Sequence, residues 1–282
     1  MKYLILGKTG LLGQAFVKSK QFEDSVALSH QELDITDFDA TESTIKKHKP
    51  DYIINCTAYT NVTAAENDKS KSFLVNGMAV GNLAKLCKRN NIKFIHFSTD
   101  YVFKGDSETK YIEPDDTNPI NIYGASKLEG EKKIVQFLNN NFLIIRISWL
   151  FGEGGNNFVS TISKLIQNRD NLKIVNDQFG KVTYTQDVVN ATQRLIALRK
   201  NGIFHFANKG ILSRYEFTKE IYRLMKTIDN SIQCRVEPIP ASEYPDKTPR
   251  PSHSCLDCSK FEIVTKTKIR NWEAAISDMI RI

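Results

Sequence analysis

The first half of the chain alternates short apolar runs with segments of helical periodicity. Polar residues do not interrupt the runs, which is typical of parallel strands covered on both faces. The runs predict strands at 3–6, 26–28, 52–55, 93–97 and 143–147, and the helical patterns between them lie near 11–19, 38–48, 72–90 and 122–138. This alternation predicts an α/β fold with a doubly wound parallel sheet.

The rhythm loosens after about residue 150. A loop is expected at 152–157, helices at 158–168, 186–199, 214–227 and 271–281, a strand at 172–175, and a proline-rich stretch at 238–251. The apolar run 203–206 is suited to a return to the main sheet. We therefore predict a dinucleotide-binding domain of residues 1–150 plus 186–208. The remaining residues, 151–185 plus 209–282, would form a smaller, sequence-discontinuous lobe that binds substrate.

Composition excludes several classes of protein. Apolar residues make up 41% and charged residues 25% of 282 residues, which are ordinary values for a globular chain and exclude a disordered one. No apolar stretch approaches the roughly 18 residues of a membrane span. The apolar run at 3–6 is too short for a signal peptide. Five cysteines do not indicate a disulfide framework, so we expect a cytoplasmic protein.

The net charge of +7 comes from basic residues that are dispersed along the chain. A nucleic-acid interface needs a clustered basic stripe, which the sequence lacks, so no nucleic-acid partner is expected. A net positive charge is equally compatible with the binding of anionic small ligands.

Three glycines, Gly7, Gly10 and Gly13, follow the first predicted strand and open the first helix. In a Rossmann-type loop such glycines permit a tight turn, a close backbone approach to a pyrophosphate, and close packing of helix on strand. The helix N-terminus adds free N–H donors and a positive dipole. The spacing GxxGxxG is one residue wider than the simplest fingerprint. The predicted cofactor loop comprises Gly7, Thr9, Gly10, Leu11, Leu12 and Gly13.

The end of the second strand should distinguish NADPH from NADH. An acid there would bind the ribose 2′-hydroxyl and repel a 2′-phosphate. The sequence places Ser29 and His30 at this point, and Lys8 lies in the glycine loop. NADPH is therefore favoured, with NADH as the alternative. Asp34 and Ile35 are candidates for an adenine contact, with the start of a helix as an equal alternative.

A Tyr-x-x-x-Lys pattern suits ketone reduction, because the tyrosine can supply a proton and a lysine one turn away can favour the phenolate. The pattern occurs three times, at Tyr123/Lys127, Tyr215/Lys219 and Tyr222/Lys226. Only the first opens the helix after the fourth strand, and strand carboxyl ends are where open α/β sheets bind ligands. Thr99, at the end of that strand, could bind the same carbonyl oxygen.

Taken together, these segments resemble the extended short-chain dehydrogenase/reductases, and within them the dTDP-4-dehydrorhamnose reductase family. The resemblance covers nearly the whole chain. Its motifs are GKTGLLG (7–13), ELDITD (32–37), DYIINCTAYTNV (51–62), STDYVF (98–103), PINIYGASKLEGE (119–131), RISWLFG (146–152), NDQFG (176–180), HFAN (205–208) and RPSHSCLD (250–257). STDYVF followed about 20 residues later by YGxxK is the most specific of these.

The resemblance implies NADPH-dependent reduction of the C4 ketone of dTDP-4-dehydro-L-rhamnose to dTDP-L-rhamnose, for polysaccharide biosynthesis. It implies Thr99, Tyr123 and Lys127 as catalytic residues. It adds Thr57, Ala58 and Tyr59, with Tyr123 and Lys127, to the cofactor site. The substrate site that it implies consists of Thr99, Asp100, Tyr101, Trp149, Asn157 and Arg250.

The chain departs from the family pattern at Thr63, Val182 and Arg214, where Asp, Pro and Trp are usual. The first helix lacks the glutamates with which some members bind a metal, so no metal is expected. The cluster of His253, Cys255 and Cys258 has no second ligand pair for zinc.

Three alternatives remain at this point. The chain could act on another 4-keto-6-deoxy nucleotide sugar, as a reductase or as an epimerase. It could also be a non-enzymatic regulatory subunit, because that of methionine adenosyltransferase resembles these reductases. A dehydratase is disfavoured because Thr99-Asp100 is followed by Tyr101 and not by Glu. A homodimer stays open.

Overall fold

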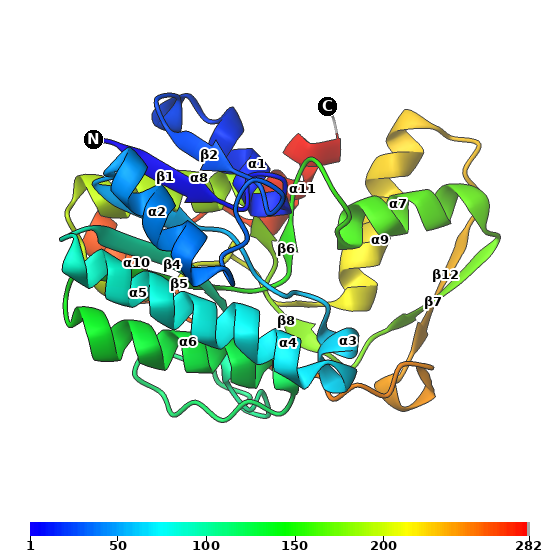
Figure 1. Ribbon diagram of the computed structural model, residues 1–282. Coiled ribbons are helices and arrows are strands. Elements are labelled where there is room, and N and C mark those ends of the chain that lie inside the picture. The colour runs from blue at the N-terminus through cyan, green and yellow to red at the C-terminus, as the bar shows by residue number, and fades with distance from the viewer. Residues whose placement is uncertain (281–282) are drawn as a thin grey trace.

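The computed structural model describes residues 1–280 and has a central sheet of six parallel strands. The strands run in the order β10-β5-β4-β3-β1-β2, which confirms the predicted fold class (Figure 1). Their bounds are β1 (Tyr3–Leu6), β2 (Val26–Leu28), β3 (Tyr52–Asn55), β4 (Lys93–Thr99), β5 (Phe142–Ile147) and β10 (Gly202–His205). The predicted return of the 203–206 run is confirmed, because β10 pairs in parallel with β5.

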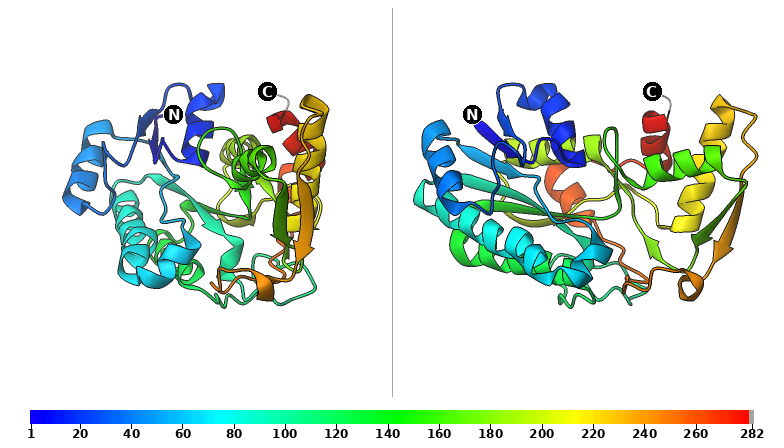
Figure 2. Two further views of the ribbon diagram at one scale, coloured as in Figure 1. Left: turned by 90° about the vertical axis from the view of Figure 1, so that its right-hand side faces the viewer. Right: turned by 45° about the vertical axis from the view of Figure 1, so that its right-hand side comes forward.

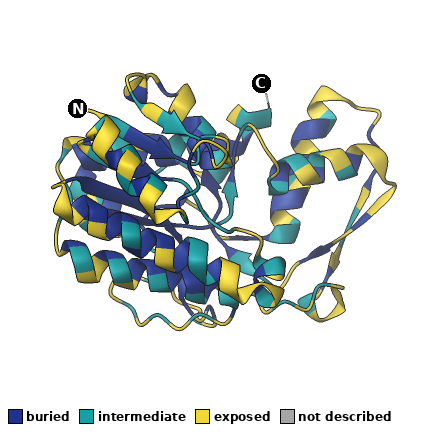
Figure 3. Ribbon diagram, viewed as in Figure 1, coloured by how far each residue is buried: buried dark blue, intermediate teal, exposed yellow. Residues whose placement is uncertain are grey.

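Helices cover both faces of this sheet. One layer contains α2 (Phe38–His48), α5 (Val80–Arg89) and α6 (Ile122–Leu138); the other contains α1 (Leu11–Lys18), α8 (Thr185–Ala197) and α10 (Ser259–Thr265). Every residue of β4 and β5 is buried, as uninterrupted apolar runs require (Figure 3).

The predicted helix 72–90 is wrong as a single element. It is divided into α4 (Lys69–Phe73), a π-helical segment η2 (Leu74–Ala79) and α5. The side chain of Asn76 explains the π-helix: its Oδ1 accepts from the Tyr59 N–H at 2.9 Å, and its Nδ2 donates to Ser126 Oγ at 2.9 Å. The wider turn therefore ties the loop after β3 to α6, as π-bulges near functional sites often do.

The second lobe stands beside the sheet and is clearest in the two turned views (Figure 2). Its helices are α7 (Phe158–Asn168), α9 (Arg214–Ile228) and α11 (Trp272–Ile280), and β7 (Asn171–Val175) pairs in parallel with β12 (Arg235–Ile239). The proline-rich stretch concealed β12, whose Pro238 is tolerated because a two-stranded sheet has only edge strands. Of the predicted helix 271–281, residue 281 lies outside the described residues.

Short elements complete the chain, and the sequence did not indicate them. They are α3 (Val62–Asn67), β6 (Leu150–Phe151), β8 (Phe179–Gly180), β9 (Thr183–Tyr184), β11 (Leu212–Ser213), and the 3₁₀ turns η1 (Lys20–Phe22), η3 (Asp100–Val102) and η4 (Ala241–Glu243). Within residues 1–280, no helix combines the length and the apolar character needed to cross a membrane.

The helix α10 lies with the sheet, although residues 209–282 were assigned to the second lobe. Phe261 of α10 packs edge-on against Phe206 with ring centroids 5.0 Å apart, inside the core formed by α1, α8 and the sheet. We keep the two-domain division as a proposal and transfer α10 to the first domain.

Candidate active site

A large cleft of about 1570 Å³ opens at the carboxyl ends of the strands and extends under the second lobe. It contains much of the predicted site; the predicted residues along it are Gly10, Leu11, Leu12, Thr57, Ala58, Thr99, Asp100, Tyr123, Lys127, Trp149, Asn157 and Arg250. Other predicted residues do not line this cleft within the described chain: Gly7, Thr9, Gly13, Ser29, His30, Asp34, Ile35, Tyr59 and Tyr101.

The glycine loop is held tightly between β1 and α1. Gly7 adopts a φ of +84°, which favours glycine, and its N–H donates to the Leu28 carbonyl at 2.8 Å. A Cβ on Gly13 would lie 2.1 Å from the Gly7 carbonyl oxygen, so only glycine permits this packing. Gly10 caps α1 without a side-chain hydrogen bond, and α1 has no acid in its first turn.

Two features of this end of the cleft fit a dinucleotide. The uncapped start of α1 offers N–H donors to phosphate oxygens. Deeper in the cleft, the buried Ser98 hydroxyl has no hydrogen-bond partner among the described residues. A cofactor that extends along the cleft would meet both groups.

Replacing Gly13 by Ala is expected to weaken NADPH binding by about tenfold or more. The new methyl must displace either α1 or the Gly7 carbonyl, and overpacking of this kind typically costs about 1–3 kcal/mol. Isothermal titration measures the affinity. Val17→Ala, at an exposed position of the same helix, is the matched control and should bind normally. Equal affinity in folded Gly13→Ala and in the control would contradict the assigned site.

Although Ser29 and His30 are not acids, a carboxylate reaches the end of β2 from further along the chain. The Glu32 carboxylate accepts from the Ser29 N–H at 2.8 Å and the Ser29 hydroxyl at 2.7 Å, and it pairs with Lys8 Nζ at 2.7 Å. These contacts, with that of Lys8 first, lower the Glu32 pKa to about 2. A turn after the strand thus places an acid from three residues beyond Ser29 at the end of β2.

The other residues predicted near the adenine are engaged locally. His30 is exposed and lies 3.8 Å from an Asp34 carboxylate oxygen. The same carboxylate accepts from both the N–H and the hydroxyl of Thr36, and Ile35 is buried in the core. The local turn therefore accounts for the side chain of Asp34 and the core for that of Ile35, and an adenine contact stays a prediction.

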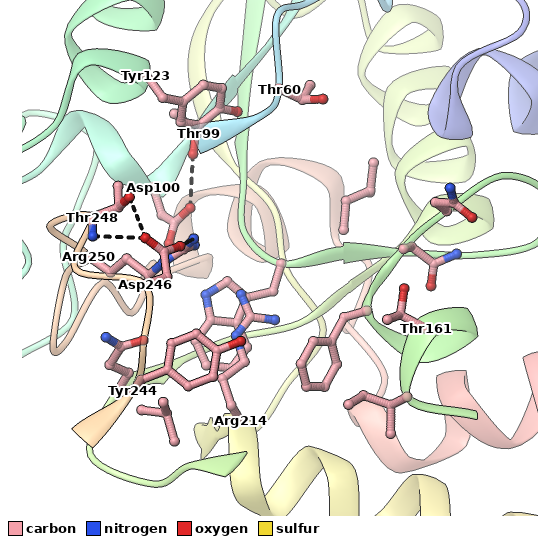
Figure 4. Close-up of a pocket in the computed structure, with 18 of the residues that line it drawn as sticks. Thr60, Thr99, Asp100, Tyr123, Thr161, Arg214, Tyr244, Asp246, Thr248 and Arg250 are labelled. Carbon is pink, nitrogen blue, oxygen red and sulfur yellow. Dashed lines mark hydrogen bonds and ion pairs between the residues drawn. The ribbon is translucent and has the colours of Figure 1, made fainter. Parts of the chain in front are cut away.

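Thr99 lies between Tyr123 and Asp100 (Figure 4). Its hydroxyl donates to Asp100 Oδ1 at 3.0 Å and accepts from the Tyr101 N–H at 3.1 Å. The Ser254 hydroxyl donates to the other Asp100 oxygen at 2.5 Å. Burial raises the pKa of Asp100 to about 6, although both hydroxyl contacts oppose the rise.

Burial also raises the pKa of the Tyr123 phenol above its ordinary value, partly opposed by the contact with Thr99. The phenol is therefore fully protonated at neutral pH, as a proton donor must be. The Tyr101 ring packs edge-on against Tyr123 with centroids 5.9 Å apart. Tyr101 thus supports the tyrosine and does not itself line the cleft.

Lys127 is buried and turns toward the sheet. Its Nζ donates to the Phe97 carbonyl at 2.6 Å and lies 3.1 Å from His96 Nε2. Within the described chain, no hydrogen bond joins it to Tyr123. Both side chains line the same cleft, and electrostatic support of the phenolate by Lys127 stays a prediction.

Trp149 connects β5 to β6 with a φ of +43°, which is strained for a bulky residue. Gly180 packs against one part of its indole, and the Arg214 guanidinium lies 3.7 Å from the ring centroid. Asn157 has a structural task, since its Oδ1 caps α7 and its Nδ2 donates to the Gly152 carbonyl. The surroundings thus fix Trp149 at the edge of the cleft.

Arg250 is held by Asp246, which the sequence analysis missed. Its Nη2 donates to Asp246 Oδ2 at 3.0 Å and to Thr63 Oγ1 at 3.3 Å, and Thr63 donates to the same carboxylate oxygen at 2.7 Å. Hydrogen bonds from Thr248 and Thr63 lower the pKa of Asp246. Asp246 thus supplies the carboxylate that joins Thr63 to Arg250.

The remaining side chains that the sequence singled out are packed. His253 stacks on Phe179, and Cys258 contacts backbone carbonyls and Lys181. Two further titratable groups lie near the sheet: burial raises the pKa of the Cys56 thiol and lowers that of His96 well below its usual range. All five cysteines are unpaired.

Comparisons with known proteins agree with this architecture. The family model described as RmlD substrate binding domain matches residues 1–282. A dTDP-4-dehydrorhamnose reductase of Aggregatibacter actinomycetemcomitans is 37% identical, covering 99% of this chain and 98% of that protein. A dTDP-4-keto-6-deoxy-D-glucose reductase of Streptomyces niveus is 33% identical, covering 98% and 95%. The crystal structure of dTDP-4-dehydrorhamnose reductase from Bacillus anthracis in complex with NADP aligns with a TM-score of 0.93 at 31% identity, covering 99% and 98%.

Proposed function

Because this chain belongs to the RmlD substrate binding domain family, we propose that it is an NADPH-dependent reductase of a nucleotide sugar. Its reaction reduces the C4 ketone of dTDP-4-dehydro-L-rhamnose and yields dTDP-L-rhamnose. The observation that carries this proposal is the placement of Tyr123 and Thr99 in the same cleft as the start of α1. One cavity can thus hold a dinucleotide and present a ketone to a phenol.

NADPH, when bound, supplies the hydride that reduces C4 of the sugar. Gly7, Gly10 and Gly13 would hold its pyrophosphate at α1. Because Glu32 stands at the end of β2, the preference for NADPH rests on the NADP complex of the Bacillus anthracis relative and no longer on the absence of an acid. Lys8 neutralises Glu32 and supplies a cation at the same place.

The proton comes from Tyr123. As negative charge develops on the sugar O4, the phenol donates its proton to that oxygen, and the alcohol forms. Thr99 lies beside the phenol, and its own proton is directed to Asp100. The buried Asp100 carboxylate, whose pKa is raised, thereby orients the Thr99 hydroxyl.

The diphosphate of the substrate requires cations at the other end of the cleft. Arg250 presents a planar guanidinium suited to phosphate oxygens, and Arg214 adds a second positive charge beside Trp149. The Asp246 carboxylate fixes the direction in which Arg250 points.

Replacing Arg250 by Ala is expected to raise KM for the nucleotide sugar by about tenfold or more and to change kcat far less. The reason is that a diphosphate far from the ketone is bound equally in the ground and transition states. Steady-state kinetics with saturating NADPH provide the test. Arg235→Ala is the control, because Arg235 is an exposed residue of β12 outside the cleft. A loss confined to kcat would contradict this role.

The defining assay follows NADPH consumption with dTDP-4-dehydrorhamnose and with UDP- and GDP-linked 4-keto sugars. Best turnover on a UDP- or GDP-linked sugar would overturn the substrate but leave the reductase. No NADPH consumption with any of these ketones, by protein that binds NADPH, would overturn the reductase itself. It would favour a regulatory subunit, for which co-purification of a partner enzyme is the check.

A second candidate is reduction of another dTDP-linked 4-keto-6-deoxy sugar. Two observations favour it: the similarity to the Streptomyces niveus enzyme, and the unusual Arg214 and Thr63 beside the cleft. We also propose a cytoplasmic location, and a homodimer that light scattering can test.

A further inference from the structure

A small anion site lies where the glycine loop meets the end of β2. The N–H groups of Gly7 and Lys8 both donate to the carbonyl of Leu28, at 2.8 and 3.0 Å, so the loop runs alongside the last residue of β2. This contact brings the Lys8 side chain close to Ser29, which follows the strand. Three donors meet at this point: the Ser29 N–H, the Ser29 hydroxyl and the Lys8 ammonium.

The carboxylate of Glu32 occupies all three donors. Its Oε2 atom accepts from the Ser29 N–H at 2.8 Å and from the Ser29 hydroxyl at 2.7 Å. Lys8 Nζ lies 2.8 Å from Oε1 and 2.7 Å from Oε2. A backbone N–H, a hydroxyl and an ammonium are also the kinds of group that bind phosphate oxygens in proteins. The three donors therefore suit a phosphate as well as a carboxylate.

The donors of this site are fixed, whereas the carboxylate can leave it. Ser29 is 5% exposed, so packing holds its N–H and its hydroxyl in place. The side chain of Glu32 is 47% exposed and that of Lys8 is 33% exposed. Ion pairs that are exposed in this way contribute little to stability, so Glu32 can turn toward solvent without disturbing the core.

Glu32 is the charged group that a ligand of this site would meet. Its contacts with Lys8 and then with Ser29 lower its pKa to about 2, so it carries a full negative charge at neutral pH. The next acid along the chain, Asp34, is engaged elsewhere, because its Oδ1 accepts from both the N–H and the hydroxyl of Thr36. The charge that opposes a second anion here is therefore that of Glu32.

The position of the site in the fold indicates its ligand. In Rossmann-type folds, the residues that follow the second strand face the adenosine ribose, which carries a 2′-hydroxyl in NADH and a 2′-phosphate in NADPH. We propose that Ser29 and Lys8 form the 2′-phosphate site of this chain, and that Glu32, which fills it, is a specificity-determining residue that lowers the preference for NADPH over NADH. This inference rests on the proposed function, because it takes a nicotinamide dinucleotide as the ligand of the glycine loop.

The two cofactors make different demands on Glu32. A phosphate monoester carries a charge of about −1.5 to −2 at pH 7, so the carboxylate has to give up Ser29 and Lys8 before a 2′-phosphate binds there. A 2′-hydroxyl is a donor, and a carboxylate can accept from it without leaving the site. The cost of displacing Glu32 therefore falls on NADPH alone.

Isothermal titration of NADPH and of NADH into the intact protein tests the inference. Glu32→Gln removes the charge and keeps the shape, and Glu32→Ala empties the site. NADPH should bind about fivefold tighter or more to both variants, since a unit charge about 4 Å from another changes a binding constant by about that factor even in water. NADH should bind no tighter to either variant, and it should bind more weakly to Glu32→Ala, which lacks the acceptor for the 2′-hydroxyl.

The matched control is Glu42→Gln, which removes the same charge from an exposed pair with Lys46 on α2 and should change neither affinity. Adenosine 2′,5′-bisphosphate and adenosine 5′-monophosphate isolate the ribose end, because they differ only in the 2′-phosphate. The bisphosphate should gain affinity in Glu32→Ala, and the monophosphate should not. Unchanged NADPH affinity in folded Glu32 variants, or an equal gain for both cofactors, would overturn the inference. A wild-type protein that binds neither cofactor would overturn the proposed function instead.

Discussion

Replacing Tyr123 by Phe is expected to lower kcat by roughly 10²–10⁴-fold, the usual contribution of a general acid. The substitution removes one hydroxyl and leaves the ring that packs against Tyr101. NADPH affinity should stay near that of the wild type, because the glycine loop is untouched. Single-turnover kinetics with saturating NADPH separate this chemical step from binding and from product release.

The matched control is Tyr215→Phe. Tyr215 also begins a Tyr-x-x-x-Lys pattern, but on α9, where the Lys219 ammonium lies over its ring at 5.6 Å. Neither Tyr215 nor Lys219 lines the cleft, so the Tyr215→Phe variant should turn over substrate at the wild-type rate. Comparable losses in the two variants, or full turnover in Tyr123→Phe, would mean that another group supplies the proton.

Replacing Arg146 by Met is expected to lower the free energy of unfolding by about 3–5 kcal/mol, the typical cost of removing one partner of a buried ion pair. Arg146 of β5 contacts the Glu131 carboxylate three times at 2.7–3.2 Å, and both side chains are 3% exposed. Methionine fills part of the space but leaves the carboxylate buried without its cation. Urea denaturation at pH 7 measures the change.

The double variant Arg146→Met/Glu131→Leu is the control. Because it removes both charges, it should recover much of the lost stability, as apolar replacements of buried ion pairs do elsewhere. If the single variant is as stable as the wild type, the Arg146–Glu131 ion pair does not stabilise the packing of α6 on β5. If the double variant is no better than the single one, lost packing explains the cost and charge does not.

The sequence predicted the central sheet closely because both faces of its strands are covered. Uninterrupted apolar runs therefore marked β1, β2 and β3 within a residue of their ends. The pattern failed where a distant contact determined the local structure. The π-helical segment depends on Asn76 reaching Tyr59 and Ser126, which no periodicity can indicate.

The candidate site was predictable where a motif is contiguous and obscure where it is assembled from distant segments. STDYVF and YGxxK gave Thr99, Tyr123 and Lys127, which all line the cleft. Glu32 was missed because a turn folds it back onto Ser29, and Asp246 because it comes from more than 180 residues beyond Thr63. The position of Lys127 toward His96 likewise depends on packing between α6 and β4.

The placement of β10 and α10 has a consequence for how the molecule can be divided. The sheet takes its edge strand from residues 202–205, and part of one helical layer comes from residues 259–265. The backbone therefore passes several times between the two lobes, and a cut near residue 150 would leave β5 paired with β4 but without β10 on its other side. Neither lobe can therefore be exchanged as one continuous segment of the chain. A chimaera between relatives has to exchange all the separate segments of a lobe together.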